Sequence, residues 1–89
     1  MSIYITAVRV SNPPSNSNIT DVRWVNPQDN QTGTNSVAEI VAWLKQPGAL
    51  AFVKGTPNIA VTVVDAKPPY LRTVANGKET DNLLSLPRF

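Results

Sequence analysis

This chain of 89 residues contains neither cysteine nor histidine. Without cysteine it can form no disulfide framework and offers no thiolate nucleophile. Without histidine it also lacks the commonest metal ligand of proteins and the commonest general base. We therefore expect no metal site and no cofactor, and we predict that the protein is not an enzyme.

Charged residues are scarce as well, at 16% of the chain, against about 25% in a typical soluble domain. The net charge is only +2, and the eight lysines and arginines are scattered, so the sequence shows no basic stripe of the kind that binds nucleic acid. No apolar run approaches the roughly 18 residues of a membrane span, and the first residues do not read as a signal peptide. We expect a cytoplasmic protein that does not enter membranes.

The length of the chain predicts a single domain over residues 1–89. A domain of this size buries roughly 60–65% of its unfolded surface, so its core is thin. Few charges and strands that are apolar on both faces favour further burial by assembly. We therefore expect a homo-oligomer.

Two strands are predicted in the first third of the chain. Ile3–Val10 carries apolar groups on both faces, which is typical of a central strand. Ile19–Val25 alternates, and its expected core face consists of Thr20, Val22 and Trp24. Proline, asparagine and serine dominate the intervening segment and favour turns. The pattern predicts an antiparallel hairpin with a long polar tip.

A helix is predicted after a polar segment, 26–35, that we interpret as a loop. Ser36 and Glu39 have the S-x-x-E spacing of a capping box, in which each side chain satisfies a free backbone N–H of the first turn. Pro47 and Gly48 end the helix. Between these signals, apolar residues at helical spacing form one stripe: Val37, Ile40, Val41 and Leu44.

Three further strands are predicted at Leu50–Lys54, Asn58–Asp65 and Tyr70–Ala75. Asn76-Gly77 has the sequence of a tight hairpin turn, after which the chain can pair back briefly. The final segment contains three leucines and is too apolar to remain in water, so we expect it to dock on the core. The sequence thus predicts an α+β domain of order ββαβββ, with a mostly antiparallel sheet, one helix packed on one face and a docked C-terminal tail.

Three segments also carry a family resemblance. They are Ile5-Thr-Ala-Val-Arg-Val-Ser-Asn12, the second predicted strand with the helix that contains Trp43-Leu44, and Tyr70-Leu-Arg-Thr-x-Ala-x-Gly77 leading into Thr80-Asp-Asn-Leu-Leu-Ser-Leu-Pro87. Together they resemble a family of small bacterial and prophage-encoded proteins known only as a domain of unknown function. Members of that family often carry a histidine where this chain has Asn18. The resemblance implies fold boundaries and no shared chemistry.

Aromatic and arginine side chains on the strands are the best candidates for a binding site. Tyr70 and Arg72 are two residues apart and project from the same face, while Arg23 and Arg9 face away from the expected core on the first two strands. A ring beside guanidinium groups can stack on a planar ligand and bind phosphate. The alternative is ordinary cross-strand pairing of these arginines with aspartates such as Asp21.

These residues predict non-enzymatic binding of a small anionic ligand, such as a nucleotide signal, which the protein would sequester or sense. The signalling context is implied by the resemblance and not by the residues. The alternative is a protein-interaction or structural module without a small ligand. We interpret Trp24 and Trp43 as core residues, since burying both would supply much of a thin core.

Overall fold

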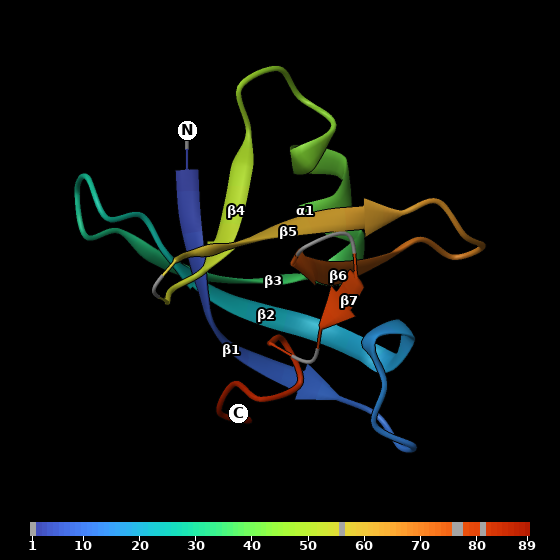
Figure 1. Cartoon of the computed structure of the whole chain (residues 1–89). Coiled ribbons are helices and arrows are strands. Elements are labelled where there is room, and N and C mark those ends of the chain that lie inside the picture. The colour runs from blue at the N-terminus through green and yellow to red at the C-terminus, as the bar shows by residue number, and fades with distance from the viewer. Residues whose placement is uncertain (1, 56, 76–77, 81) are drawn as a thin grey trace.

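The computed structural model describes residues 2–55, 57–75, 78–80 and 82–89. One seven-stranded sheet has the order β3-β2-β1-β4-β5-β6-β7 (Figure 1). Neighbouring strands pair antiparallel except β1 and β4, which run parallel. In chain order the elements are β1 (Ser2–Val10), the 3-10 turn η1 (Asn16–Asn18), β2 (Ile19–Val25), β3 (Thr32–Ser36), α1 (Val37–Leu44), β4 (Leu50–Val53), β5 (Ile59–Val64), β6 (Tyr70–Ala75) and β7 (Lys78–Thr80).

The predicted α+β architecture with one helix on a mostly antiparallel sheet is confirmed. The short pairing after the fifth predicted strand is also confirmed, as β7, while the predicted turn at Asn76-Gly77 lies outside the described residues. Helix α1 contacts β2 and β3 as well as β5 and β6. Because these strands come from both halves of the sheet, the sheet curves around the helix.

Strand β3 was missed, because the segment 26–35 was predicted to be a loop. Thr32–Ser36 contains no large apolar residue, so it lacks the hydrophobic alternation that identifies strands. Pairing with β2 at five positions holds it in the sheet instead. The turn before it is closed by the Asn26 N–H, which donates to the Gln31 carbonyl at 2.7 Å, and it includes Asn30 at a φ of 59°. The element order is therefore βββαββββ.

Helix α1 begins at the predicted capping box. The Glu39 backbone N–H donates to the Ser36 hydroxyl at 3.2 Å, and the Ser36 backbone N–H donates to Glu39 Oε1 at 3.0 Å. Both bonds satisfy donors that would otherwise have no partner in the first turn. The first turns of the helix bury Val37, Ile40 and Val41 against the sheet.

Strand β1 is central along its length, as its two apolar faces predicted. β2 lies on one side, and β4 pairs with its first residues on the other. Further along, the C-terminal tail takes the place of β4: the Val8 N–H donates to the Pro87 carbonyl at 3.0 Å, and the Phe89 N–H donates to the Val8 carbonyl at 3.3 Å. Leu83 is completely buried, so the docked tail is confirmed.

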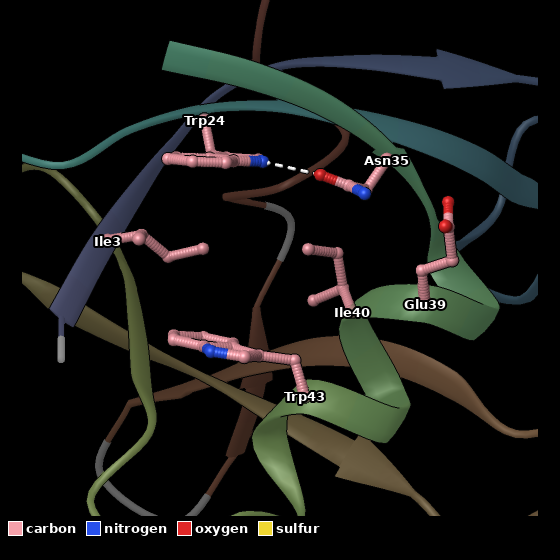
Figure 2. A pocket seen from close by; sticks show the side chains of 6 residues that line it. All are labelled: Ile3, Trp24, Asn35, Glu39, Ile40 and Trp43. Atoms are coloured by element: carbon pink, nitrogen blue, oxygen red, sulfur yellow. Dashed lines mark hydrogen bonds between the residues drawn. The ribbon is translucent and has the colours of Figure 1, made fainter. Parts of the chain in front are cut away.

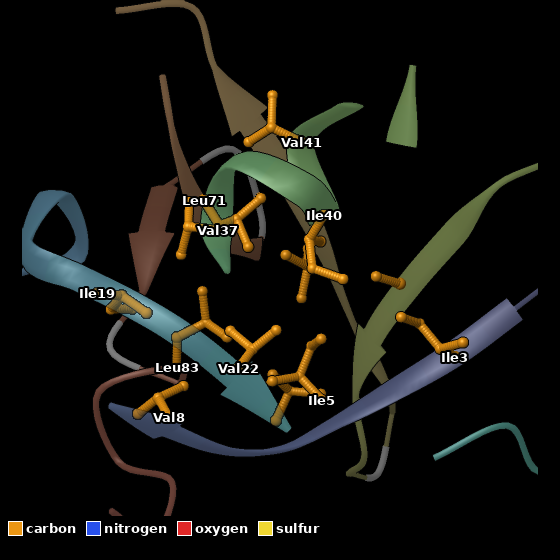
Figure 3. Close-up of a cluster of buried hydrophobic side chains, with 13 residues drawn as sticks. Ile3, Ile5, Val8, Ile19, Val22, Val37, Ile40, Val41, Leu71 and Leu83 are labelled. Carbon is orange, nitrogen blue, oxygen red and sulfur yellow. The ribbon is translucent and has the colours of Figure 1, made fainter. Parts of the chain in front are cut away.

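The hydrophobic core lies between the concave face of the sheet, the helix and the start of the tail (Figure 3). Both tryptophans, together with Leu44 and Leu84, pack against it while remaining partly exposed. The core itself consists of Ile3, Ile5, Val8, Ile19, Val22, Val37, Ile40, Val41, Ala51, Val53, Val61, Leu71 and Leu83.

Candidate functional site

A pocket of about 130 Å³ lies between the helix and the first strands of the sheet. Figure 2 shows the indole rings of Trp24 and Trp43 on opposite sides of it, roughly parallel to each other, with Ile3 and Ile40 between them. Asn35 and Glu39 complete the described lining, at one rim. The two rings therefore face each other across a space that the protein itself does not fill.

Trp24 is fixed by strand β3. Its indole Nε1–H donates to Asn35 Oδ1 at 2.8 Å. Gly33 is its register partner, and a Cβ atom at Gly33 would lie 2.6 Å from Trp24 Cζ2. The absence of a side chain at this position lets the indole lie against the backbone of β3. One side of the ring is thus covered by the strand, and the other faces the pocket.

Trp43 reaches the pocket from the last turn of α1. Its backbone carbonyl accepts hydrogen bonds at the end of the helix, including one from the Gln46 N–H at 3.0 Å. The residue is half-buried, beside the apolar stripe that packs on the sheet. The ring is therefore carried by a rigid element and remains accessible at the pocket, which suits a binding group.

Glu39 places a carboxylate at the rim of the pocket. Hydrogen bonds from the Ser36 backbone, from the Ser36 hydroxyl and from the Asn35 side chain lower the pKa of Glu39, in that order of effect. The carboxylate is therefore ionised at neutral pH. Asn35, which accepts the bond from the Trp24 indole, lies beside this carboxylate at the same rim.

Trp24 and Trp43 were interpreted as core residues; both pack against the core but are only half-buried, and the interpretation missed the pocket between them. Seeing the pocket from sequence would have required β3, which supplies both Gly33 and Asn35. The nearest signal in the sequence was Gly33 within a polar segment, but a glycine in such a segment is ordinarily explained by a turn.

Two of the predicted site residues come together on the opposite face of the sheet. Arg9 and Arg23 are exposed, and their guanidinium carbons lie 4.8 Å and 4.5 Å from the ring centroid of Phe89. Arg9 Nε also donates to the Phe89 carbonyl oxygen at 3.3 Å, and Arg9 Nη1 lies 3.9 Å from Asp21 Oδ2. We call Arg9, Arg23 and Phe89 the arginine surface. The cross-strand alternative also has support, because Arg9 and Asp21 are register partners.

Tyr70 and Arg72 lie elsewhere in the sheet. They stand on β6, which β4 and β5 separate from β1. Leu71, between them, is fully buried, so Tyr70 and Arg72 project from the other face and are half-buried. The Arg72 Nε is buried, and no hydrogen-bond partner for it is found among the residues that the structure describes. The aromatic ring that accompanies Arg9 and Arg23 is thus Phe89 and not Tyr70.

A second and more open hollow, of about 430 Å³, is bordered by β1 and the tail. Its described cation is Lys54, and its lining mixes polar and apolar groups: Tyr4, Ile5, Thr6, Val25, Pro27, Asn30, Lys54 and Leu86. Within the described residues, no three His, Cys, Asp or Glu side chains are grouped so that they could hold a metal ion. No described helix is long and apolar enough to cross a membrane.

The comparisons with known proteins agree with the resemblance seen in the sequence. A family model with the description "Protein of unknown function (DUF3892)" matches residues 4–87, and the chain therefore belongs to this family. Comparison with curated proteins found no match, and comparison with solved structures found none either.

Proposed function

We propose that this member of the DUF3892 family is a non-enzymatic binding domain, and that the space between Trp24 and Trp43 holds part of a small ligand. The observation that carries the proposal is the pair of indole faces on either side of an unfilled pocket of about 130 Å³. An apolar protein cavity of roughly 150 Å³ takes up a benzene molecule. The pocket therefore suits one ring, or one group of similar size.

The supporting structure around the two rings favours binding over simple core packing. Each indole is oriented by a separate element, and Trp24 is held by a hydrogen bond of 2.8 Å to Asn35 and by contact with Gly33. Aromatic rings in a core normally pack against other side chains. Here one face of each ring is directed toward the pocket, whose sides are formed by Ile3 and Ile40, as in sites where a few convergent polar groups accompany an apolar lining.

The two tryptophans are the only ones in the chain, and both line the pocket. Intrinsic tryptophan fluorescence thus reports on this site without a label. We expect a panel of single-ring compounds, nucleosides, nucleotides and organic amines to contain members that change the emission saturably. Trp43→Leu should abolish this response, whereas Phe52→Leu, which shortens a half-buried aromatic residue on β4, should preserve it.

A thermal-shift measurement with the same panel provides an independent readout, because a ligand that binds only the folded state raises the melting temperature. A panel that changes neither the emission nor the melting temperature would contradict the proposed site. It would favour the alternative of a protein-interaction or structural module, whose assembly state is measured by light scattering.

The arginine surface supports a second candidate, the anionic ligand expected from the sequence. Two exposed guanidinium groups beside a ring can bind phosphate and stack on a planar group. A nucleotide signal, in the bacterial or prophage context that the resemblance implies, is the ligand we propose for this surface. Arg23→Lys should weaken its binding, since an ammonium cannot reproduce the bidentate fork. If Arg72→Ala weakens the binding of the nucleotide as much as Arg23→Lys does, Tyr70 and Arg72 also belong to the binding site. If only Arg23→Lys weakens the binding, the site is restricted to the arginine surface.

A further inference from the structure

The charged group at the pocket between the tryptophans is an acid. Of the described residues that line it, Glu39 alone is ionisable, and its carboxylate lies at the rim beside Asn35. Lys45, two residues beyond Trp43, is exposed and is not among the lining residues, and two other cations lie elsewhere. Arg23 precedes Trp24 in β2 and so projects from the other face of the sheet, and Lys54 borders the second hollow. An anion would meet no positive group among the described lining residues.

The two indoles add to this preference. The face of an aromatic ring is the negative part of its quadrupole, and tryptophan attracts a cation more strongly than tyrosine or phenylalanine does. In this pocket two such faces point toward the same space. A cation there interacts with both rings at once and is shielded from water by them, which strengthens the attraction.

The size and the lining of the pocket restrict the kind of cation. Ile3 and Ile40 close its sides, and the oxygen-bearing side chains of the described lining, Asn35 and Glu39, lie only at one rim, which is too few ligands to replace the water shell of a metal ion. A volume of about 130 Å³ accommodates an organic group of about one ring. The matching chemistry is a weakly hydrated organic cation whose charge is spread over alkyl groups.

Building on the binding pocket proposed above, we propose that its ligand is an alkylated ammonium group, held between Trp24 and Trp43 and attracted by Glu39. The group can belong to a free small molecule or to a methylated lysine side chain. Glu39 acts through its field at the rim, because its carboxylate is already hydrogen-bonded to Ser36.

Three compounds of nearly equal shape test the charge preference. Choline carries a positive trimethylammonium group, 3,3-dimethylbutan-1-ol carries a neutral tert-butyl group of the same shape, and 3,3-dimethylbutanoate joins that neutral tert-butyl group to a negative carboxylate. We expect choline to quench or shift the tryptophan emission with an affinity at least about tenfold above that of the neutral alcohol, and the anion to bind most weakly. Equal binding of choline and the alcohol, or tighter binding of the anion, would overturn the inference and leave the binding pocket itself standing.

Two variants separate the contributions of the acid and the rings. Glu39→Gln keeps the capping geometry, because glutamine also serves in a capping box. We expect it to weaken choline binding about two- to fivefold, as suits a charge acting through solvent at the rim, without altering the binding of the alcohol. Trp43→Leu should abolish the binding of both compounds, and unchanged choline binding in this variant would overturn the inference.

A peptide that contains trimethyllysine, compared with the same peptide unmodified, distinguishes the two sources of the ligand. Tighter binding of the trimethylated peptide than of choline identifies a side chain of another protein, and binding of choline alone identifies a free small molecule. Both results support an alkylated ammonium ligand. If none of these probes and no ring compound changes the emission or the melting temperature, the proposed function and the inference fail together.

Discussion

Replacing Gly33 by alanine should destabilise the domain through the indole of Trp24. The added Cβ atom would lie 2.6 Å from Trp24 Cζ2 and 2.8 Å from Cε2, closer than the non-bonded contacts that Cβ atoms make, so one of the two groups must shift. The hydrogen bond from its Nε1 to Asn35 opposes a shift of the ring, although the pocket on its other side leaves room for one. Overpacking of this kind costs about 1–3 kcal/mol.

Part of this cost is offset by the backbone. Glycine in a strand is about 0.5–1 kcal/mol less favourable than alanine because it loses more conformational freedom on folding. The net loss in Gly33→Ala should therefore lie between about 0 and 2.5 kcal/mol. In a domain of this size, each 1 kcal/mol lowers the melting temperature by about 4–8 °C. Urea denaturation followed by circular dichroism measures the same quantity without depending on the emission of Trp24.

A double-mutant cycle tests the stated cause. Trp24→Leu removes the ring atoms that the new Cβ would meet, so adding Gly33→Ala to that variant should be neutral or slightly stabilising. The coupling energy between the two positions should then be about 1–3 kcal/mol, within the range found for residues in contact. Equal destabilisation by Gly33→Ala in both backgrounds would refute the argument that Gly33 exists to accommodate the indole.

Three further predictions concern the tail, the helix cap and its pH dependence. Leu83→Ala should cost about 2–5 kcal/mol of unfolding free energy, because Leu83 is completely buried. Leu50→Ala, at a residue that is 51% exposed, should cost far less. Equal losses in the two variants would show that the tail is not part of the core. Ser36→Ala should cost about 1 kcal/mol by removing the cap, measured by urea titration. The Ser36 bonds lower the pKa of Glu39. The stability that these bonds provide is therefore complete above the ordinary pKa of a glutamate, and it is lost as the pH falls through the lowered pKa. The difference in unfolding free energy between wild type and Ser36→Ala should accordingly shrink in acid. A difference that stays constant with pH would contradict this assignment.

Local signals in the sequence were sufficient to predict the helix and its cap. Ser36 and Glu39 are three residues apart, and their hydrogen bonds depend only on the first turn of the helix. The apolar faces of β1 likewise predicted its central position. These features depend on residues that are neighbours in the chain, so the tertiary structure had little to add.

The candidate site depended on contacts between distant segments, and these could not be predicted. The arginine surface is completed by Phe89, which lies 80 residues from Arg9 in sequence and reaches it because the tail replaces β4 along β1. The apolar residues of the tail predicted that it docks on the core, but not where along the sheet it does so. The pocket depends on β3, whose stability comes from its pairing with β2 and not from its own composition.

The central claim is that a ligand group lies between the two indole rings. The most direct test is a nuclear magnetic resonance experiment that detects short distances between the methyl protons of bound choline and the protein. We predict intermolecular nuclear Overhauser effects from these methyl groups to ring protons of both Trp24 and Trp43. Effects to only one ring, or to Phe89 of the arginine surface instead, would contradict the claim.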